Sequence, residues 1–203
     1  MLLSTRRELE EFLGDFDPRP IGGDGLRRAA VACVLAPRRD GELSFLLTRR
    51  ASTLRRHRGQ FALPGGRIDP GESADLAARR ELHEELAVDL APSAVLGRLD
   101  DYATRSGYVI TPVVLWCDAR PEVRPAPEEV ARVFRVSFAE LDHEQMPTLR
   151  AIEESDRPVL SVPLRGNFVH APTAAVIYQL WEMVWRGRRV HVADYEQPVF
   201  AWR

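Results

Sequence analysis

The sequence contains no lysine, so arginine supplies all 28 of its basic residues. A gene rich in guanine and cytosine would produce this bias as readily as selection for guanidinium chemistry, so the absence alone excludes no function. The basic residues are balanced by 30 acidic ones, which leaves a formal net charge of -2. This balance argues against a general nucleic-acid binder and against a polybasic membrane anchor.

Cysteine and long apolar runs are also scarce. The two cysteines, Cys33 and Cys117, lie in apolar stretches, where we expect buried thiols in a reducing compartment rather than a disulfide scaffold or zinc site. No apolar run approaches the ~20 residues of a membrane helix, and the N-terminal residues lack the apolar core of a signal peptide. These absences favour a cytoplasmic protein whose partners are neither nucleic acid nor membrane.

The remaining composition is typical of a globular protein, with 203 residues of which 45% are hydrophobic. No linker or internal repeat divides the chain, so the sequence predicts a single domain over residues 1–203. Within it we expect an N-terminal helix and linker (1–25), a core (26–141) and a C-terminal strand, helix and tail (142–203).

Periodicity and turn residues predict a mixed α/β order of elements. Apolar residues at helical spacing indicate a helix from Ser4 to Phe16, with Ser4 or Thr5 as its N-cap. Asp40-Gly41 indicates a hairpin between two strands within 26–51. The further elements expected are a loop over 52–60, a short strand that ends in a turn within 61–66, helices over 73–88 and 173–187, and strands within 93–103, 108–119, 130–138 and 158–164.

The helix over 73–88 carries an unusual acidic face. At about 100° per residue, Glu81, Glu84 and Glu85 lie on one face, although like charges at this spacing repel each other. A hard cation such as Mg²⁺ would cancel that repulsion, since it prefers oxygen ligands. Arg80 can pair with Glu84 or with Glu72 and hold a carboxylate in place. The alternative is an acidic face that is simply solvated.

The turn before this helix, Pro64-Gly65-Gly66, favours the ligand-binding interpretation. Glycine lets a backbone approach a ligand closely, and a freed carbonyl of Gly66 could join a metal shell. The turn and the helix together resemble the signature of the Nudix hydrolases. The matching positions, at fixed spacing, are Gly66, Glu72, Arg80, Glu81, Leu82, Glu84, Glu85 and Val88.

One position departs from that signature, because Ala87 stands where the family has glycine. Either the alanine adopts a left-handed conformation, at about 1 kcal/mol, or the helix runs on a little further. The resemblance implies the Nudix fold, an α/β (α+β) fold with a mixed sheet between helices. It also implies an enzyme that cleaves nucleoside diphosphate derivatives.

A second resemblance points to a branch of the family, the coenzyme A pyrophosphatases. It covers roughly Leu43 to Leu141, with Leu63 standing where the branch usually has an aromatic residue. Ser106-Gly107-Tyr108 also resembles that branch. The matching residues of its motif are Leu46, Leu47, Thr48, Arg50, Ala51, Arg55, Gly59, Pro64, Gly65 and Gly66.

Arginine is dense just ahead of the glycine turn, as a substrate with a diphosphate and a ribose 3′-phosphate requires. The alternative is a solvated basic loop, and His57 is more readily explained as part of that loop than as a phosphate ligand. Which arginine meets which phosphate is open. The candidate substrate-binding residues are Arg49, Arg50, Arg55, Arg58, Gly65 and Gly66.

The implied reaction is hydrolysis of coenzyme A or acyl-coenzyme A to 3′,5′-ADP and a 4′-phosphopantetheine product. Mg²⁺ or Mn²⁺ would be held by Glu81, Glu84, Glu85 and the Gly66 carbonyl, and would activate a water molecule. Glu81 is the favoured general base. Glu128 and Glu129, in a later loop, are further catalytic candidates, since relatives often carry an extra carboxylate there.

Other functions remain open at this point. Within the family, hydrolysis of ADP-ribose or NADH is the main alternative, and a non-catalytic Nudix-like ligand sensor is a minor one. The aromatic residues of the 173–187 helix indicate core or dimer contact rather than a substrate pocket. The family resemblance makes a homodimer the expected assembly.

Overall fold

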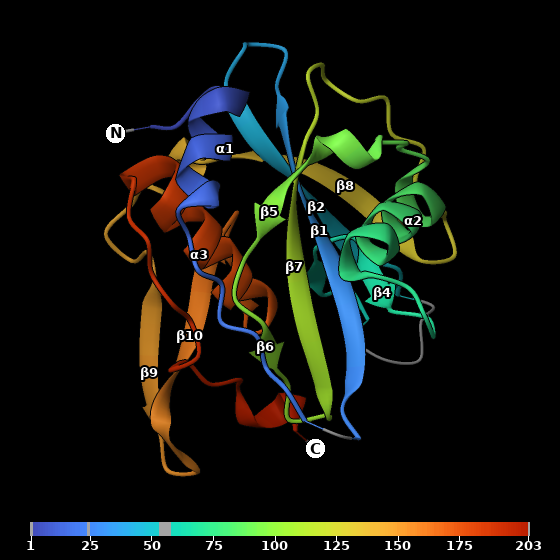
Figure 1. Ribbon diagram of the computed structural model, residues 1–203. Coiled ribbons are helices and arrows are strands. Elements are labelled where there is room, and N and C mark those ends of the chain that lie inside the picture. Colours follow the sequence, from blue (N-terminus) through green and yellow to red (C-terminus); the bar gives the residue numbers. More distant parts are fainter. Residues whose placement is uncertain (1, 24, 53–57, 203) are drawn as a thin grey trace. The chain divides into compact units, whose positions relative to one another are not determined.

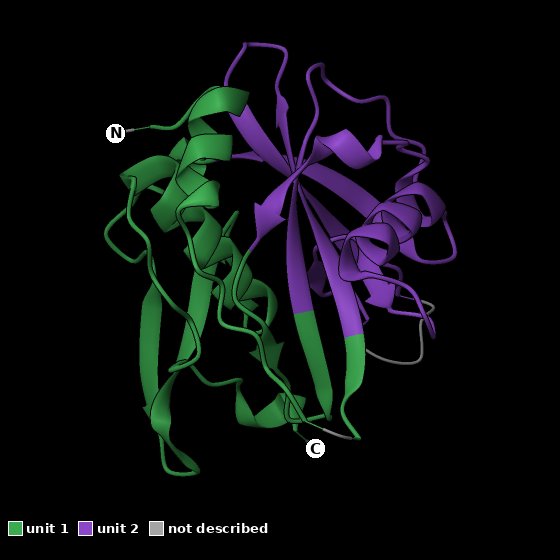
Figure 2. Cartoon of the chain, viewed as in Figure 1, with its two compact units in different colours: residues 1–28, 99–110, 138–203 green, residues 29–98, 111–137 purple. Residues whose placement is uncertain are grey.

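The structure is a computed structural model that describes residues 2–23, 25–52 and 58–202. It combines helices and strands (Figure 1), so the predicted mixed α/β class is confirmed. The chain forms two compact units, each discontinuous in sequence (Figure 2). Unit 1 comprises residues 1–28, 99–110 and 138–203, and unit 2 comprises residues 29–98 and 111–137. A single domain over residues 1–203 stays a prediction.

Unit 2 contains most of an eight-stranded sheet and one α-helix. The strand order is β3-β2-β1-β7-β5, with β4 paired to β1 and β8 paired to β2. The elements are β1 (Arg27–Pro37), β2 (Leu43–Arg50), β3 (Phe61–Ala62), β4 (Gly65–Arg67), α2 (Ala74–Leu86), η1 (Pro92–Ala94), β5 (Val95–Arg98), β7 (Tyr108–Trp116) and β8 (Val130–Ser137).

The β1–β2 hairpin is confirmed, with antiparallel register and Gly41 at a positive φ of 83° in the turn. The short strand predicted within 61–66 is confirmed as β3, but Gly65 and Gly66, expected in the turn that follows it, belong to a second strand, β4. Those residues form two short strands, because β3 pairs with β2 whereas β4 pairs with β1. Leu63 and Pro64 lie between them, where the chain changes partner.

One helix, α2, covers a face of the unit 2 sheet. Its small and aliphatic residues pack against Ala30, Val34 and Leu46 of β1 and β2 and against Val113 and Leu115 of β7. This packing removes apolar area from water, which is the main stabilising contribution here. The helix therefore presents its opposite face away from the sheet.

Unit 1 contains two α-helices and a three-stranded antiparallel sheet in the order β11-β10-β9. In α1, Thr5 is the N-cap and forms a capping box with Glu8, which decides between the two predicted caps. The elements are α1 (Arg6–Gly14), β6 (Tyr102–Ala103), η2 (Ala139–Leu141), β9 (Thr148–Ile152), β10 (Ser155–Leu164), β11 (Asn167–His170), α3 (Thr173–Arg186) and η3 (Val199–Ala201).

Two of these strands, β9 and β11, were not predicted from the sequence. They are mostly exposed and lack a clear alternation, so only their pairing with β10 makes them strands. In α3, which packs on β10 and β11, Leu180, Trp181 and Val184 are buried. These three residues of α3 therefore belong to the core of unit 1, whereas Tyr178 and Trp185 are half-buried.

The two cysteines are free thiols. Cys33 is fully buried, and burial raises the pKa of its thiol. Cys117 is only half-buried, so the prediction of a second buried thiol is wrong; it follows the last residue of β7, where the strand reaches the surface. Among the described residues, no helix combines the length and the apolar character needed to cross a bilayer.

Candidate active site

The local sequence fixes α2 at both ends. Ser73 is the N-cap, and its hydroxyl accepts a hydrogen bond from the Leu76 N–H. The helix ends at Leu86, and Ala87 adopts the left-handed conformation with φ 53° and ψ 36°. The structure thus decides between the two expectations for Ala87: the helix stops, as it would at the family's glycine.

The three acidic side chains of α2 have different environments. Glu85 is buried, the side chain of Glu81 is 15% exposed, and that of Glu84 is 54% exposed. Ala78, Leu82 and Leu86 occupy the apolar face and are fully buried. The predicted separation into an acidic and an apolar side is therefore confirmed, although Glu85 lies nearest the core.

Arg80 connects the acidic residues. Its guanidinium donates to Glu72 Oε1 at 3.0 Å, to Glu81 Oε1 at 2.8 Å and to Glu84 Oε2 at 3.1 Å. It also donates to the carbonyl of Arg67 at 2.9 Å. Hydrogen bonds from Arg80 outweigh burial and lower the pKa of Glu72. Arg80 therefore fixes the rotamers of two site carboxylates and joins α2 to β4.

Strand β4 approaches the same carboxylates through its backbone. The Gly65 N–H donates to Glu85 Oε1 at 3.2 Å. At Gly66, a Cβ atom would lie 2.3 Å from Glu81 Oε1, so the Glu81 carboxylate lies directly against the glycine. At Gly65 a Cβ atom would lie 2.3 Å from the Ala30 carbonyl oxygen, so the backbone of β1 leaves no room for a side chain there. That these glycines admit a ligand stays a prediction.

Burial and mutual repulsion act on the titration of these groups. Burial raises the pKa of Glu85 to about 7; the Gly65 N–H and the Arg50 charge oppose this, and the charges of Glu129 and Glu81 add to it. Burial also raises the pKa of Glu81, against the hydrogen bond from Arg80. The site therefore concentrates negative charge in a partly desolvated place.

The loop that precedes β8 docks on the C-terminal end of α2. The Arg124 N–H donates to the Leu86 carbonyl at 2.8 Å and the Ala126 N–H to the Glu85 carbonyl at 2.9 Å. Such bonds satisfy carbonyls that a helix end leaves free. They place Glu129 close enough to influence the pKa of Glu81 and Glu85.

The predicted arginines do not all gather at this place. Arg50 follows Leu46 and Thr48 on the α2 side of β2, and its charge lowers the pKa of Glu85. Arg49 points to the opposite side of the sheet, because successive strand residues alternate. Arg58 is exposed in a turn. Arg55 and His57 lie outside the described residues.

The carboxylate oxygens of Glu81, Glu84 and Glu85 beside the backbone of Gly66 are ligands of the type that Mg²⁺ or Mn²⁺ prefers. In the described ranges, however, no three His, Cys, Asp or Glu side chains converge as a ready metal-binding group. Arg80 already pairs with Glu81 and Glu84. Metal binding by Glu81, Glu84, Glu85 and Gly66 therefore stays a prediction.

The sequence did not reveal the positions of Arg132 and Phe134 beside Arg49. Strands β2 and β8 pair in antiparallel register, which places Arg49 opposite Arg132 and Leu47 opposite Phe134. No local motif announces this pairing, since 83 positions separate the two arginines in the sequence. The apolar alternation of β8 was the available signal for a strand, but it does not name the partner.

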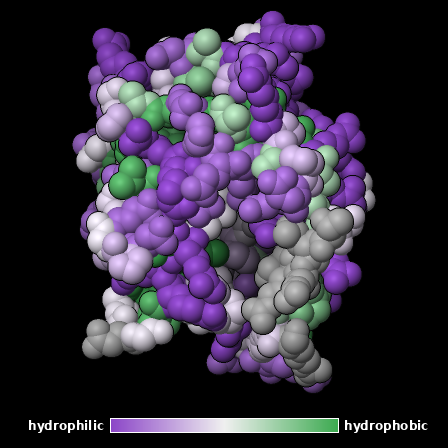
Figure 3. Space-filling view, turned by 90° about the vertical axis from the view of Figure 1, so that its right-hand side faces the viewer, coloured by the Kyte–Doolittle hydropathy of each residue, from purple (hydrophilic) through white to green (hydrophobic). Residues whose placement is uncertain are grey.

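Hydrophilic residues predominate on the face shown in Figure 3, which turns the right-hand side of Figure 1, with α2, toward the reader. Hydrophobic residues lie scattered between them.

Comparison with known proteins gives a consistent result. A family model described as NUDIX domain matches residues 26–160. NudL of Yersinia pestis, named an uncharacterized Nudix hydrolase, is 41% identical over 115 residues, which cover 56% of this chain and 57% of NudL. The match thus spans little more than half the length of this curated relative.

Two solved structures show the same fold. A NUDIX hydrolase from Alicyclobacillus acidocaldarius has a TM-score of 0.52 and 19% identity, covering 78% of this chain and 92% of that one. A MutT/nudix family protein from Enterococcus faecalis has a TM-score of 0.51 and 14% identity, covering 82% of this chain and 58% of that one. The predicted Nudix fold is therefore confirmed.

Proposed function

The chain belongs to the NUDIX domain family, and we propose that it hydrolyses the diphosphate bond of coenzyme A or acyl-coenzyme A. The products are 3′,5′-ADP and 4′-phosphopantetheine or its acyl derivative. The observation that carries the proposal is the group of α2 carboxylates held by Arg80 against Gly66, with Arg50 beside Glu85.

Glu81, Glu84 and Glu85 would hold Mg²⁺ or Mn²⁺, with the Gly66 carbonyl as a further ligand. When bound, the cation supplies charge neutralisation at the diphosphate and lowers the pKa of a water molecule. Arg80 keeps Glu81 and Glu84 in position through its bonds of 2.8 and 3.1 Å. This contribution is mainly positioning, as in other phosphoryl transfers.

The carboxylates divide the remaining work. Glu81 takes a proton from the attacking water as general base, since its partly buried carboxyl lies against the glycine turn. Glu129 is the second candidate for proton transfer or for a further metal ligand, because its charge acts on both Glu81 and Glu85. Glu128, an exposed residue of the same loop, is the further candidate, and we place it below Glu129.

The proposed substrate class rests on the arginine side chains at and ahead of this site. Arg50 lies on the α2 side of β2, where a diphosphate oxygen can take its hydrogen bonds. Arg49, Arg55 and Arg58 complete the arginine-rich stretch, whose motif resembles the coenzyme A branch of the family.

A homodimer is the proposed assembly, which sedimentation analysis would test.

A substrate panel tests the proposal. With Mg²⁺ or Mn²⁺, the purified protein should cleave coenzyme A or an acyl-coenzyme A faster than ADP-ribose or NADH. Cleavage of ADP-ribose with coenzyme A untouched would refute the substrate assignment while leaving the family assignment intact.

Two variants test the site itself. Glu84→Gln and Glu85→Gln should abolish turnover while circular dichroism shows an unchanged fold. Glu122→Gln removes an exposed carboxylate of the same unit and is the matched control, with activity close to that of the unmodified protein. Normal turnover by either site variant would contradict the metal assignment.

A further inference from the structure

Two arginines stand directly opposite each other on neighbouring strands of unit 2. Arg49 near the end of β2 is the register partner of Arg132 in β8. Both side chains are exposed. Directly opposed residues of an antiparallel pair project from the same face, and like charges in such a pair destabilise the sheet. A bound anion would relieve this repulsion.

No carboxylate supplies that compensation within the described part of the chain, where neither guanidinium forms an ion pair with Asp or Glu. Arg49 donates through Nε to the Gly59 carbonyl at 3.0 Å, which orients its guanidinium. The guanidinium carbon of Arg132 lies 5.1 Å from the centre of the Phe134 ring. Among the residues that the structure describes, the hydrogen bond to Gly59 is the only one that these two guanidiniums form, so their terminal nitrogens can bind an external acceptor.

Aromatic side chains border the arginine pair. Phe61 of β3 is the register partner of Arg49, and its ring centre lies 5.4 Å from that of Phe134. Phe134 is nearly buried, whereas Phe61 is half-buried and so retains an accessible ring surface. A partly exposed aromatic ring beside paired arginines is a combination that can bind the base and phosphate of a nucleotide.

Strand alternation separates this group from the α2 carboxylates. Leu46, Thr48 and Arg50 face α2, whereas Arg49 faces the other side with its partner Arg132. The adjacent residues Arg49 and Arg50 can therefore contact different parts of one extended ligand at the end of β2. A substrate with two separate phosphate groups has this requirement.

We propose that Arg49 and Arg132 form a second anion site that binds a phosphate monoester on an adenine nucleotide, with the base stacked on Phe61. The naming of this group as the ribose 3′-phosphate of coenzyme A rests on the proposed function. The arginine pair then sets specificity, because it distinguishes substrates that carry the additional phosphate from those that lack it.

Nucleotide binding to the full chain tests the site without relying on catalysis. Isothermal titration calorimetry with 3′,5′-ADP and with AMP should show preference for the bisphosphate by about tenfold, the value of one charge-assisted contact. Arg132→Gln and Arg49→Gln should each remove most of that preference. Phe61→Leu should weaken the binding of both nucleotides to a similar extent. Arg124→Gln, which removes an exposed arginine of the same unit, is the control and should keep the preference.

The proposal is overturned if the unmodified protein binds both nucleotides equally, or if the preference survives in both arginine variants. Thermal unfolding of each variant checks the fold, and Arg132→Gln remains informative if Arg49→Gln disturbs the Gly59 turn.

Kinetics separate this proposal from the proposed function. The ratio of kcat/KM for coenzyme A to that for dephospho-coenzyme A should fall about tenfold in Arg132→Gln. An unchanged ratio in an active enzyme refutes the second site and leaves the hydrolase intact. Arginine-dependent binding of 3′,5′-ADP by a protein that cleaves neither compound refutes the hydrolase and supports the site.

Discussion

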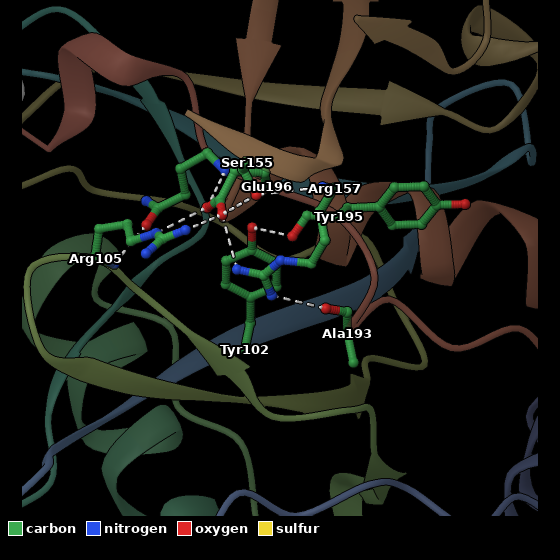
Figure 4. A network of polar contacts seen from close by, with 8 residues as sticks. Tyr102, Arg105, Ser155, Arg157, Ala193, Tyr195 and Glu196 are labelled. Atoms are coloured by element: carbon green, nitrogen blue, oxygen red, sulfur yellow. Dashed lines mark hydrogen bonds and ion pairs between the residues drawn. The ribbon is translucent and has the colours of Figure 1, made fainter. Parts of the chain in front are cut away.

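Replacing Glu196 by glutamine preserves the shape of the side chain but removes the charge at the centre of a polar network in unit 1 (Figure 4). Glu196 is only 2% exposed. Its carboxylate accepts hydrogen bonds from Arg157 Nη2 at 2.7 Å, from Arg105 Nη2 at 2.5 Å and from Ser155 Oγ at 3.1 Å. We expect the variant to be less stable at neutral pH.

The expected magnitude follows from the pKa. Burial by itself raises the pKa of Glu196, but bonds from Arg105, the Gln197 N–H and Arg157 outweigh it and lower the pKa to about 2. A lowering from 4.5 to about 2 corresponds to roughly 3 kcal/mol at neutral pH. The side chains of Arg105 and Arg157 are 42% and 45% exposed, so water screens part of this attraction. We therefore expect about 1–3 kcal/mol.

The contribution depends on pH with a definite sign. Because the pKa of Glu196 is lower in the folded protein, the stabilisation is complete above about pH 4.5 and disappears as the pH falls toward 2. Urea unfolding at pH 7 and at successively lower pH should show the difference between the two proteins shrinking.

An exposed carboxylate of the same unit provides the control. Glu153→Gln should change the free energy of unfolding by less than about 0.5 kcal/mol at every pH. If Glu196→Gln is as stable as the unmodified protein at pH 7, or if its deficit does not shrink in acid, the assigned role of the ion pairs is refuted.

Three further changes test the backbone and a second network, each by urea unfolding. Ala87→Gly should stabilise the protein by about 1 kcal/mol or less, since only glycine adopts φ 53° without strain; a loss of stability would contradict this. Gly65→Ala should destabilise the protein by about 1–3 kcal/mol, because the new Cβ would lie 2.3 Å from the Ala30 carbonyl oxygen. Gly14→Ala is the control and should not destabilise it, since no atom lies within 4 Å of the Cβ position there. Asp100→Ala should lower the free energy of unfolding by about 2–3 kcal/mol, because the N–H groups of Arg19 and Val192 lose the carboxylate to which they now donate at 2.9 and 3.1 Å. A loss no larger than that of Asp194→Ala, which removes an exposed carboxylate, would refute this expectation.

Local patterns of the sequence determined much of the candidate site. Helical periodicity placed Glu81, Glu84 and Glu85 on one side of α2 and the aliphatic stripe on the other, as the structure shows. Asp40-Gly41 determined the β1–β2 turn, and the spacing around Gly66 led to the family. These features depend on neighbours within about one helical turn or one hairpin, so a linear pattern contains them.

Other features depend on residues that only folding brings together. The sequence could not rank Glu129 above Glu128, because that ranking comes from the loop that docks on the end of α2. It predicted a short strand that ends in a turn at 61–66, where pairing with two different partners produces both β3 and β4. Strands β9 and β11 exist because β10 supplies their hydrogen bonds.

The arginines show the same division most directly. The sequence alone determined that Arg49 and Arg50 lie together ahead of the glycine turn. Only the tertiary structure decided that Arg50 faces Glu85 while Arg49 meets Arg132 from a strand 83 positions away. The physical reason is that the spacing of residues along one chain determines helix faces and tight turns, whereas strand register is determined by the packing of the whole sheet.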